Sequence, residues 1–403
     1  MTAMSRSDVE ERLVRSLTGA NAVAEAMRQV DPEVVAAYPI TPSTIAVETF
    51  SRMVADGMVH TEFVPVESEH SAMSACIGAA ASGVRAQTVT SSQGLALMWE
   101  LLYVASGLRL PIVLHVANRT LSAPINIHCD HSDAMGARDA GWVQLFAENP
   151  QEVYDHALMA VRIAEDPRVR LPVMECQDGY TVSHNAERVE VLPDSVAHLF
   201  VGEYEAPYSL LDTSHPVTVG ALTGPDYFFE LRRQLAQAME AARETIPMVF
   251  REYGEVSGRF YGAVEGEGLE DAELGLVVMG SSAGTVREVV RALRRQGLRV
   301  ALVKVRVFRP FPEVEMREAL AGLRAVGVLD RALSPGAVGN ALYTDVVTTL
   351  ARGGQAPAVV GYTYGLGGRE LRPAHVLEAF KDLARVAEDG PAAQELFYVG
   401  LRE

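Results

Sequence analysis

Short apolar runs alternate with stretches of helical periodicity through the first half of the chain. The run 111–116 (PIVLHV) is uninterrupted, which is typical of a parallel strand buried on both faces. Strands alternating with helices predict a parallel, doubly wound sheet. The predicted strands are 34–38, 62–65, 86–90, 111–116 and 173–176, and the predicted helices are 44–56, 71–82, 94–106 and 150–166.

A second alternating pattern begins near residue 272. It predicts strands at 274–279 and 300–305 around a helix at 285–296, and further apolar segments continue the alternation at 326–329, 342–350 and 358–360. The segment 186–262 interrupts the two patterns. It is acidic, contains Pro193, Pro207 and Pro216, and is predicted to be a wrapping linker that ends in a charged helix at 225–244.

The expected fold class is therefore α/β, with two doubly wound parallel-sheet domains. A chain of 403 residues is too long for one ordinary hydrophobic core. We predict an N-terminal extension at 1–17, a larger domain with its trailing linker at 18–245, and a smaller α/β domain at 246–403.

Composition narrows the class of partner. The formal net charge is −17 and no Lys/Arg cluster occurs, which argues against nucleic acid and anionic membranes as partners. The N-terminus has no apolar signal-peptide core, and no run of about 18 uncharged apolar residues predicts a membrane span. A cytoplasmic location is the expectation.

The three cysteines, Cys76, Cys129 and Cys176, are scattered and none lies in a CxxC motif. An iron–sulfur cluster needs four protein ligands, so this chain alone does not hold one in the usual way. We expect the three thiols to be buried and to act as small hydrophobic groups. No resident metal site is predicted.

Glu69 is the first candidate for chemistry, because it lies between a predicted strand and a helix of small residues. Two interpretations are open: a catalytic carboxylate, or an acidic group placed at a helix N-terminus for its dipole. Glu67 shares a face with Glu69 if the segment is extended, and only one of the two need be functional.

Arg119 follows the most strongly predicted strand, and ligands of open α/β sheets bind at the carboxyl ends of strands, so Arg119 is well placed for a carboxylate. Asp130, His131 and Asp133 follow on a loop. We favour a hydrogen-bonded cluster that orders the loop and caps the next helix over a metal site. The turn 280–284 could hold an anion, but a glycine turn that allows close helix–sheet packing is favoured.

Several motifs together resemble one family, the α subunit of pyruvate:ferredoxin oxidoreductase within the 2-oxoacid:ferredoxin oxidoreductases. The resemblance covers about residues 18–380 in the right order. The motifs are YPITPS (38–43), ESEHSA (67–72), SSQGL (91–95), NR (118–119), SAPIN (122–126), DHSD (130–133), RVFRPFP (306–312) and GLGGR (365–369).

The resemblance implies a thiamine diphosphate (ThDP) pyrimidine-binding domain followed by a transketolase C-terminal-like domain with a structural and interface role. A β subunit is expected to supply the diphosphate and Mg²⁺ site and a [4Fe-4S] cluster, with γ and δ subunits and ferredoxin as further partners. This division accounts for a missing motif, because the nearest match to a GDG diphosphate motif is QDGY at 177–180.

The resemblance also implies roles for individual residues. Glu69 is expected to hydrogen-bond the pyrimidine ring nitrogen and so activate the cofactor. Thr41 is expected to contact the oxygen atoms of the substrate, and Arg119 to pair with its carboxylate. Further cofactor contacts are expected from Pro39, Ile40 and Gln93.

The implied reaction is the coenzyme A-dependent oxidative decarboxylation of pyruvate to acetyl-CoA and CO₂, or the reverse carboxylation, with ferredoxin as the electron carrier. The same chemistry on 2-oxoisovalerate, 2-oxoglutarate or oxalate is the close alternative. A non-catalytic scaffold that has kept the fold is disfavoured, because Thr41, Glu69 and Arg119 are all present.

Overall fold

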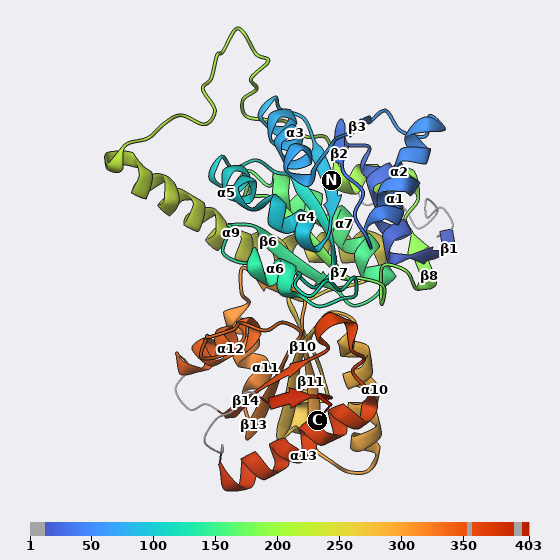
Figure 1. Ribbon diagram of the computed structural model, residues 1–403, viewed down its shortest axis with the longest axis vertical. Coiled ribbons are helices and arrows are strands. Elements are labelled where there is room, and N and C mark those ends of the chain that lie inside the picture. Colours follow the sequence, from blue (N-terminus) through green and yellow to red (C-terminus); the bar gives the residue numbers. More distant parts are fainter. Residues whose placement is uncertain (1–12, 353–356, 391–396, 403) are drawn as a thin grey trace.

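A computed structural model describes residues 13–352, 357–390 and 397–402. Two α/β units lie one above the other, each with helices on both faces of a largely parallel sheet (Figure 1). The expected fold class is confirmed. Within these residues no helix is both long and apolar enough to cross a membrane.

The larger unit is built on a seven-stranded sheet in the order β12-β6-β7-β5-β4-β2-β3. All neighbouring strands are parallel except β12, which pairs antiparallel with β6. The strands are β2 (Val34–Ala37), β3 (Glu62–Pro65), β4 (Ala86–Thr90), β5 (Val113–Asn118), β6 (Val143–Ala147), β7 (Val173–Asp178) and β12 (Val307–Arg309). The sequence analysis did not predict β6.

The helices of this unit cover both faces of the sheet. Buried residues of α1, α2 and α7 form one core with one face, and those of α3 and α5 form a second core with the other face. The helices are α1 (Gly19–Val30), α2 (Thr44–Ala55), α3 (Glu69–Ala81), α4 (Ser92–Leu97), α5 (Trp99–Gly107), α6 (Ser132–Gly136) and α7 (Pro150–Glu165). The helix predicted at 94–106 is present as two helices, α4 and α5, which meet at Met98, where the dihedral angles stay in the right-handed helical region.

Within the predicted linker at 186–262, the helix expected from residue 225 is present and residues 202–224 contain no helix or strand, but two further elements were not predicted. β8 (Ala186–Val191) pairs antiparallel with β1 (Leu13–Thr18), which takes up the end of the predicted N-terminal extension. After α8 (Asp194–Val201), the helix α9 runs from Pro225 to Ser257. The prediction ended this helix at 244, but buried residues at helical spacing continue it, with Pro247 inside.

The smaller unit has a six-stranded sheet in the order β15-β14-β13-β10-β11-β9, with β9 antiparallel to β11. Its strands are β9 (Val264–Glu267), β10 (Leu274–Met279), β11 (Val300–Val305), β13 (Ala325–Asp330), β14 (Ala358–Tyr364) and β15 (Phe397–Val399). Its helices are α10 (Ser282–Arg295), α11 (Glu313–Leu320), α12 (Ala341–Ala351) and α13 (Pro373–Asp389).

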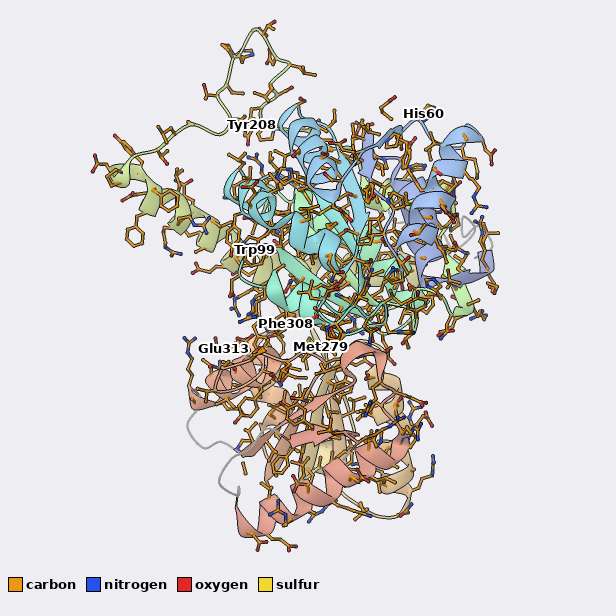
Figure 2. The ribbon with its side chains drawn as sticks, in the orientation of Figure 1. His60, Trp99, Tyr208, Met279, Phe308 and Glu313 are labelled. Carbon is orange, nitrogen blue, oxygen red and sulfur yellow. The ribbon has the colours of Figure 1, made fainter. Side chains whose placement is uncertain are left out.

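The RVFRPFP segment joins the two units. Its strand β12 is an edge strand of the larger sheet, and Phe308 lies at the junction (Figure 2). The Phe308 ring packs edge-on against Phe146, with centroids 6.2 Å apart. Beside it, buried Arg306 donates to Glu152 at 2.8 Å. One apolar core therefore continues from the larger unit into the smaller one.

The division predicted between residues 245 and 246 falls inside α9, which is continuous there. The first strand of the smaller sheet begins at Val264. The domain boundaries stay a prediction, but this one does not coincide with the end of an element.

Candidate active site

The predicted site residues follow four neighbouring strands of the larger sheet. Thr41 follows β2, Glu69 follows β3, Gln93 follows β4, and Arg119 comes directly after β5. The carboxyl ends of parallel strands meet at one edge of a sheet, which is where open α/β sheets bind ligands. The fold therefore gathers residues that are up to 78 positions apart in sequence.

Glu69 is the first residue of α3, two residues earlier than predicted. Ser68 caps this helix, and its hydroxyl accepts a hydrogen bond from the Ser71 N–H at 3.2 Å. Only 6% of Glu69 is exposed, and its carboxylate has no hydrogen-bond partner among the residues that the structure describes. The helix dipole favours negative charge at this position, so both interpretations of Glu69 fit its placement.

Glu67 contrasts with Glu69 although it is only two residues away. It is fully exposed, and its carboxylate accepts a hydrogen bond from the Ser71 hydroxyl at 2.6 Å. That bond lowers the pKa of Glu67. Of the two carboxylates, only Glu69 is buried and free to take a further donor.

Gly94 allows the backbone of α4 to approach Glu69 closely. A β-carbon at Gly94 would lie 2.7 Å from the Glu69 Oε1 atom and would overlap the Thr90 hydroxyl. The Thr90 and Ser91 hydroxyl oxygens are buried without a hydrogen-bond partner in the described part of the chain. Sequence reasoning gave Gly94 no role, since the requirement arises from a neighbour 25 residues away.

Arg119 is brought together with Thr41. Its Nη1 atom donates to the Thr41 backbone oxygen at 2.9 Å, and its Nε atom donates to the Asn126 backbone oxygen at 3.2 Å. A guanidinium carries five N–H donors, so these two bonds leave donors for a carboxylate. Arg119 is 6% exposed, whereas Thr41 is exposed.

Asp133 fixes the ends of β4 and β5 relative to each other. Its carboxylate accepts hydrogen bonds from the backbone N–H groups of Ser92 and Arg119, each at 3.0 Å, and from the Asn118 side chain at 2.9 Å. Burial raises the pKa of Asp133 to about 6. The predicted loop-ordering cluster is confirmed at this residue.

The remaining predicted residues lie around this edge. The Gln93 side chain donates to the Ser122 hydroxyl at 2.8 Å, which ties the β4 end to the loop after β5. Pro39 is exposed and Ile40 is half-buried, and the Ile40 carbonyl oxygen accepts from the Ser43 N–H at 2.8 Å. These contacts order the turn after β2.

The predicted capping of α6 by an aspartate is made by Asp130, which lies one residue before the N-cap position. His131 occupies the N-cap position and makes no capping bond with its side chain, whereas the preceding Asp130 accepts from the Ser132 N–H at 3.0 Å. His131 turns inward instead, and its Nε2 atom lies 2.7 Å from Asp178 Oδ1.

Asp178 is the centre of a buried cluster between the two units. It accepts hydrogen bonds from the Ser281 N–H at 3.0 Å and the Arg331 guanidinium at 2.7 Å. Burial opposes its ionisation, but Arg331 and His131 outweigh burial and hold the pKa of Asp178 well below its usual range. The turn at 280–284 therefore binds an anion, and that anion is a carboxylate of the same chain.

Cys129, His131 and Asp178 present three potential ligand atoms within 4.8 Å of one another. The Arg331 guanidinium lies at 2.7 Å from Asp178 and carries the positive charge that a metal ion would bring. The grouping is therefore better described as a hydrogen-bonded ion pair. All three cysteines are free and buried, as expected.

Two family models match this chain. The model described as "Pyruvate flavodoxin/ferredoxin oxidoreductase, thiamine diP-bdg" matches residues 25–251, and the model "Pyruvate:ferredoxin oxidoreductase core domain II" matches residues 272–376. The first match contains Thr41, Glu69, Gln93 and Arg119. The second contains the turn at 280–284 and the GLGGR motif.

Curated relatives match over nearly their whole length. The pyruvate synthase subunit PorA of Thermotoga maritima is 52% identical over 98% of this chain and 100% of the relative. PorA of Methanothermobacter thermautotrophicus is 43% identical over 97% and 99% of the two chains. The ketoisovalerate oxidoreductase subunit VorA of Pyrococcus abyssi is 41% identical over 98% and 100%.

A solved structure supports the fold. The 2-oxoglutarate:ferredoxin oxidoreductase of Magnetococcus marinus superposes with a TM-score of 0.73 at 20% identity, over 92% of this chain and 65% of that chain. At this identity the likeness concerns the fold alone.

Proposed function

The chain belongs to the pyruvate flavodoxin/ferredoxin oxidoreductase family, and on that premise we propose that it is the α subunit of a ThDP-dependent pyruvate synthase. The proposed reaction converts pyruvate and coenzyme A to acetyl-CoA and CO₂, or runs in the reverse direction, with ferredoxin as the electron carrier. The subunit works together with partner subunits. Its site of action is proposed to be the cytoplasm.

The observation that carries the proposal is Glu69, a residue only 6% exposed whose carboxylate has no hydrogen-bond partner among the described residues. A buried polar group without a partner is uncommon in a folded protein, and each instance calls for an explanation. In its imino tautomer, the cofactor's pyrimidine ring carries an N–H that would donate a hydrogen bond to this carboxylate. The unpartnered Thr90 and Ser91 hydroxyls and the close approach at Gly94 fit a flat polar ring in the same place.

When bound, ThDP supplies the nucleophilic carbon that adds to the 2-oxo group. Glu69 is proposed to hold a proton at the pyrimidine nitrogen and so set the tautomer of the ring. Arg119 is proposed to orient the substrate carboxylate with its remaining N–H donors, and Thr41 to contact the substrate oxygens from the exposed turn. Pro39, Ile40 and Gln93 are proposed to line the cofactor side.

Two features of the chain support a shared site. Asp178, the aspartate of the nearest diphosphate-like motif, is occupied by Arg331 and Ser281. The three cysteines are too few for a cluster. We therefore propose that a β subunit holds the diphosphate, Mg²⁺ and a [4Fe-4S] cluster, and that γ and δ subunits complete the hetero-oligomer.

We favour pyruvate over 2-oxoisovalerate as the substrate because the Thermotoga PorA is 52% identical to this chain, although PorA and VorA of Pyrococcus abyssi are nearly equal at 42% and 41%. The test is turnover of the purified complex on pyruvate, 2-oxoisovalerate, 2-oxoglutarate and oxalate. The highest kcat/KM is expected for pyruvate. A higher kcat/KM for 2-oxoisovalerate would mean that the proposed reaction type is right and the proposed substrate is wrong.

Cofactor binding separates this proposal from a scaffold role. Calorimetric titration of ThDP with Mg²⁺ into the complex, and into each subunit alone, is expected to give binding only in the complex. A scaffold subunit would add nothing to the affinity that the partner shows by itself.

A further inference from the structure

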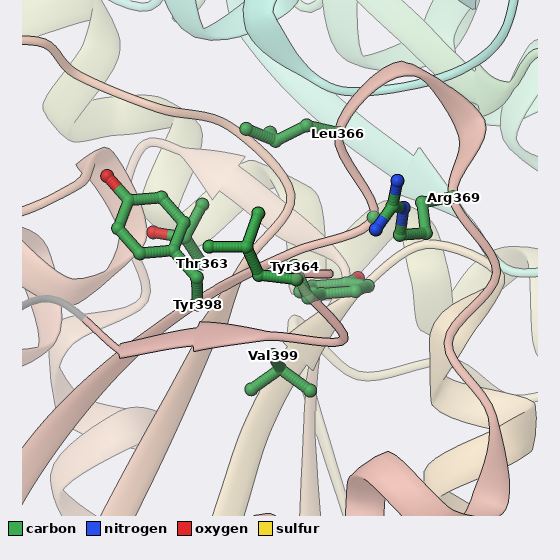
Figure 3. A pocket seen from close by; sticks show the side chains of 8 residues that line it. Thr363, Tyr364, Leu366, Arg369, Tyr398 and Val399 are labelled. Atoms are coloured by element: carbon green, nitrogen blue, oxygen red, sulfur yellow. The ribbon is translucent and has the colours of Figure 1, made fainter. Parts of the chain in front are cut away.

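The GLGGR segment of the smaller unit reaches the loop that holds Arg119. Residues 365–369 follow β14 and extend toward the larger unit (Figure 3). The Gly367 carbonyl oxygen accepts from the Asn126 side-chain amide at 2.9 Å, and the Gly367 N–H donates to Asp130 Oδ2 at 3.1 Å. The Gly368 N–H donates to the Cys129 carbonyl oxygen at 2.6 Å.

The glycines of this segment are required twice over. Gly367 and Gly368 have φ values of +60° and +81°, in the left-handed region that favours glycine. In addition, a β-carbon at Gly367 would overlap the Asn126 amide nitrogen, and one at Gly368 would overlap the His128 β-carbon. The motif therefore serves close contact with residues 126–128.

The alternative explanation of the GLGGR segment is that it lines a ligand site. The cavity at its base measures about 170 Å³ and is lined by Thr363, Tyr364, Leu366, Arg369, Tyr398 and Val399 among others (Figure 3). Small-molecule sites span about 300–1,000 Å³, so this cavity is too small for a cofactor, and the neighbouring cavity of about 430 Å³ is lined by only one residue of the segment, Arg369. Contact with the neighbouring loop is the better explanation of the motif.

Asn126 is hydrogen-bonded both to Gly367 of the smaller unit and to Arg119. Its amide group is held by Gly367, its Oδ1 atom accepts from the His128 N–H at 2.8 Å, and its backbone oxygen accepts from Arg119 Nε at 3.2 Å. The loop is closed by the bond from the Thr120 N–H to the His128 carbonyl oxygen at 3.1 Å. The Nε bond fixes the plane of the guanidinium, because all atoms of that group are coplanar.

We propose that Asn126, held by Gly367 of the smaller unit, is a positioning residue for Arg119 and thereby for the carboxylate of the 2-oxoacid. This inference rests on the proposed function of Arg119. It gives the smaller unit a part in substrate binding, beyond the structural and interface role that the sequence predicted. Asn126 itself acts through Arg119 and is not a catalytic residue.

The test is the steady-state kinetics of the complex carrying Asn126→Ala. Asn126→Ala removes the side-chain bonds to Gly367 and His128 but keeps the backbone oxygen that binds Arg119. The resulting displacement of Arg119 is expected to raise KM for pyruvate about 2- to 10-fold. KM for coenzyme A is expected to stay unchanged, and kcat to change less than KM. An unchanged KM for pyruvate, or an equal rise in both KM values, would overturn the proposal.

A double-mutant cycle with Arg119→Lys tests whether Asn126 acts through Arg119. Lysine has no Nε–H fork to align, so adding Asn126→Ala to that background is expected to raise KM for pyruvate no further. Additive effects would mean that Asn126 acts independently of Arg119, and the proposal would fall. If Arg119→Lys alone leaves KM for pyruvate unchanged, the proposed function of Arg119 fails instead.

Gly367→Ala disturbs the same contact from the side of the smaller unit. It replaces Asn126→Ala as the test if the Asn126→Ala subunit does not assemble into the complex. It is expected to reproduce the rise in KM for pyruvate. Gly336→Ala is the matched control, because Gly336 has φ +81° in the same unit and open space around its β-carbon position. Equal kinetic effects of the two alanines would show backbone strain alone and would overturn the proposal.

Discussion

The carboxyl-terminal edges of the two sheets are the same kind of structure put to different uses. At the edge of the larger sheet, the Thr90 and Ser91 hydroxyls are buried without a hydrogen-bond partner in the described part of the chain, and Glu69 is only 6% exposed. At the edge of the smaller sheet, Ser281 and Arg331 are bonded to Asp178 of the larger unit. The second edge is therefore an interface between the two units, and the first is where we propose that the ligand binds.

The difference shows why fold alone does not locate an active site. Both edges present backbone N–H groups and turn glycines, which are the usual elements of a ligand site in a doubly wound fold. What distinguishes them is whether the same chain already satisfies the polar groups. At the second edge the groups that face Asp178 are paired within the chain, although the Tyr364 hydroxyl at the end of β14 is buried without a partner among the described residues.

The largest effect is expected at the unpaired edge. Glu69→Gln in the complex should lower kcat for pyruvate by roughly 10²–10⁴, because the amide cannot hold the proton that a carboxylate accepts. Glu67→Gln, two residues away and fully exposed, is the control and should stay near the wild-type value. If Glu69→Gln kept full activity, Glu69 would not be the activating carboxylate, and the two edges would not differ in the way described above.

At the paired edge the expected effect is on stability. Asp178→Ala leaves the buried Arg331 guanidinium without its counter-ion, so the free energy of unfolding should fall by about 3–5 kcal/mol. Asp139→Ala removes an aspartate that is 71% exposed and 3.8 Å from Arg138, and should change the free energy by no more than about 0.5 kcal/mol. Urea unfolding measures both, and similar values for the two variants would contradict the role given to Asp178.

The smallest effect concerns Asp330, at the end of β13 beside Arg331. Its carboxylate accepts from the N–H groups of Leu342 and Tyr343, at 2.9 and 3.0 Å, yet burial raises its pKa to about 7. In the unfolded chain the same group ionises near pH 4, so between these values the folded protein binds more protons. Stability should therefore fall as pH rises from about 4 to about 7.

The Asp330 contribution can be separated from that of other carboxylates. The difference in unfolding free energy between wild type and Asp330→Asn should shrink by about 1–3 kcal/mol between pH 4.5 and pH 7.5. Urea midpoints at the two values measure it. A difference that is constant with pH, or that grows, would show that Asp330 is ionised throughout.

The sequence by itself determined the fold class and most of the elements. Apolar runs such as 111–116 and 274–279 identify buried parallel strands, because both faces of such strands are covered and no polar alternation remains. It also singled out Thr41, Glu69 and Arg119, through motifs at the ends of strands. Their catalytic and binding roles stay predictions that the proposed variants test.

Only the tertiary structure decided which of these groups remain unpaired. Local pattern gives Glu67 and Glu69 the same chemistry, and burial against Gly94 separates them. The turn at 280–284 and the GLGGR motif resemble ligand loops in sequence, but their partners are Asp178 and Asn126, more than 100 residues away. Which residues meet across that distance depends on how the two sheets pack against each other. No local sequence pattern specifies this packing.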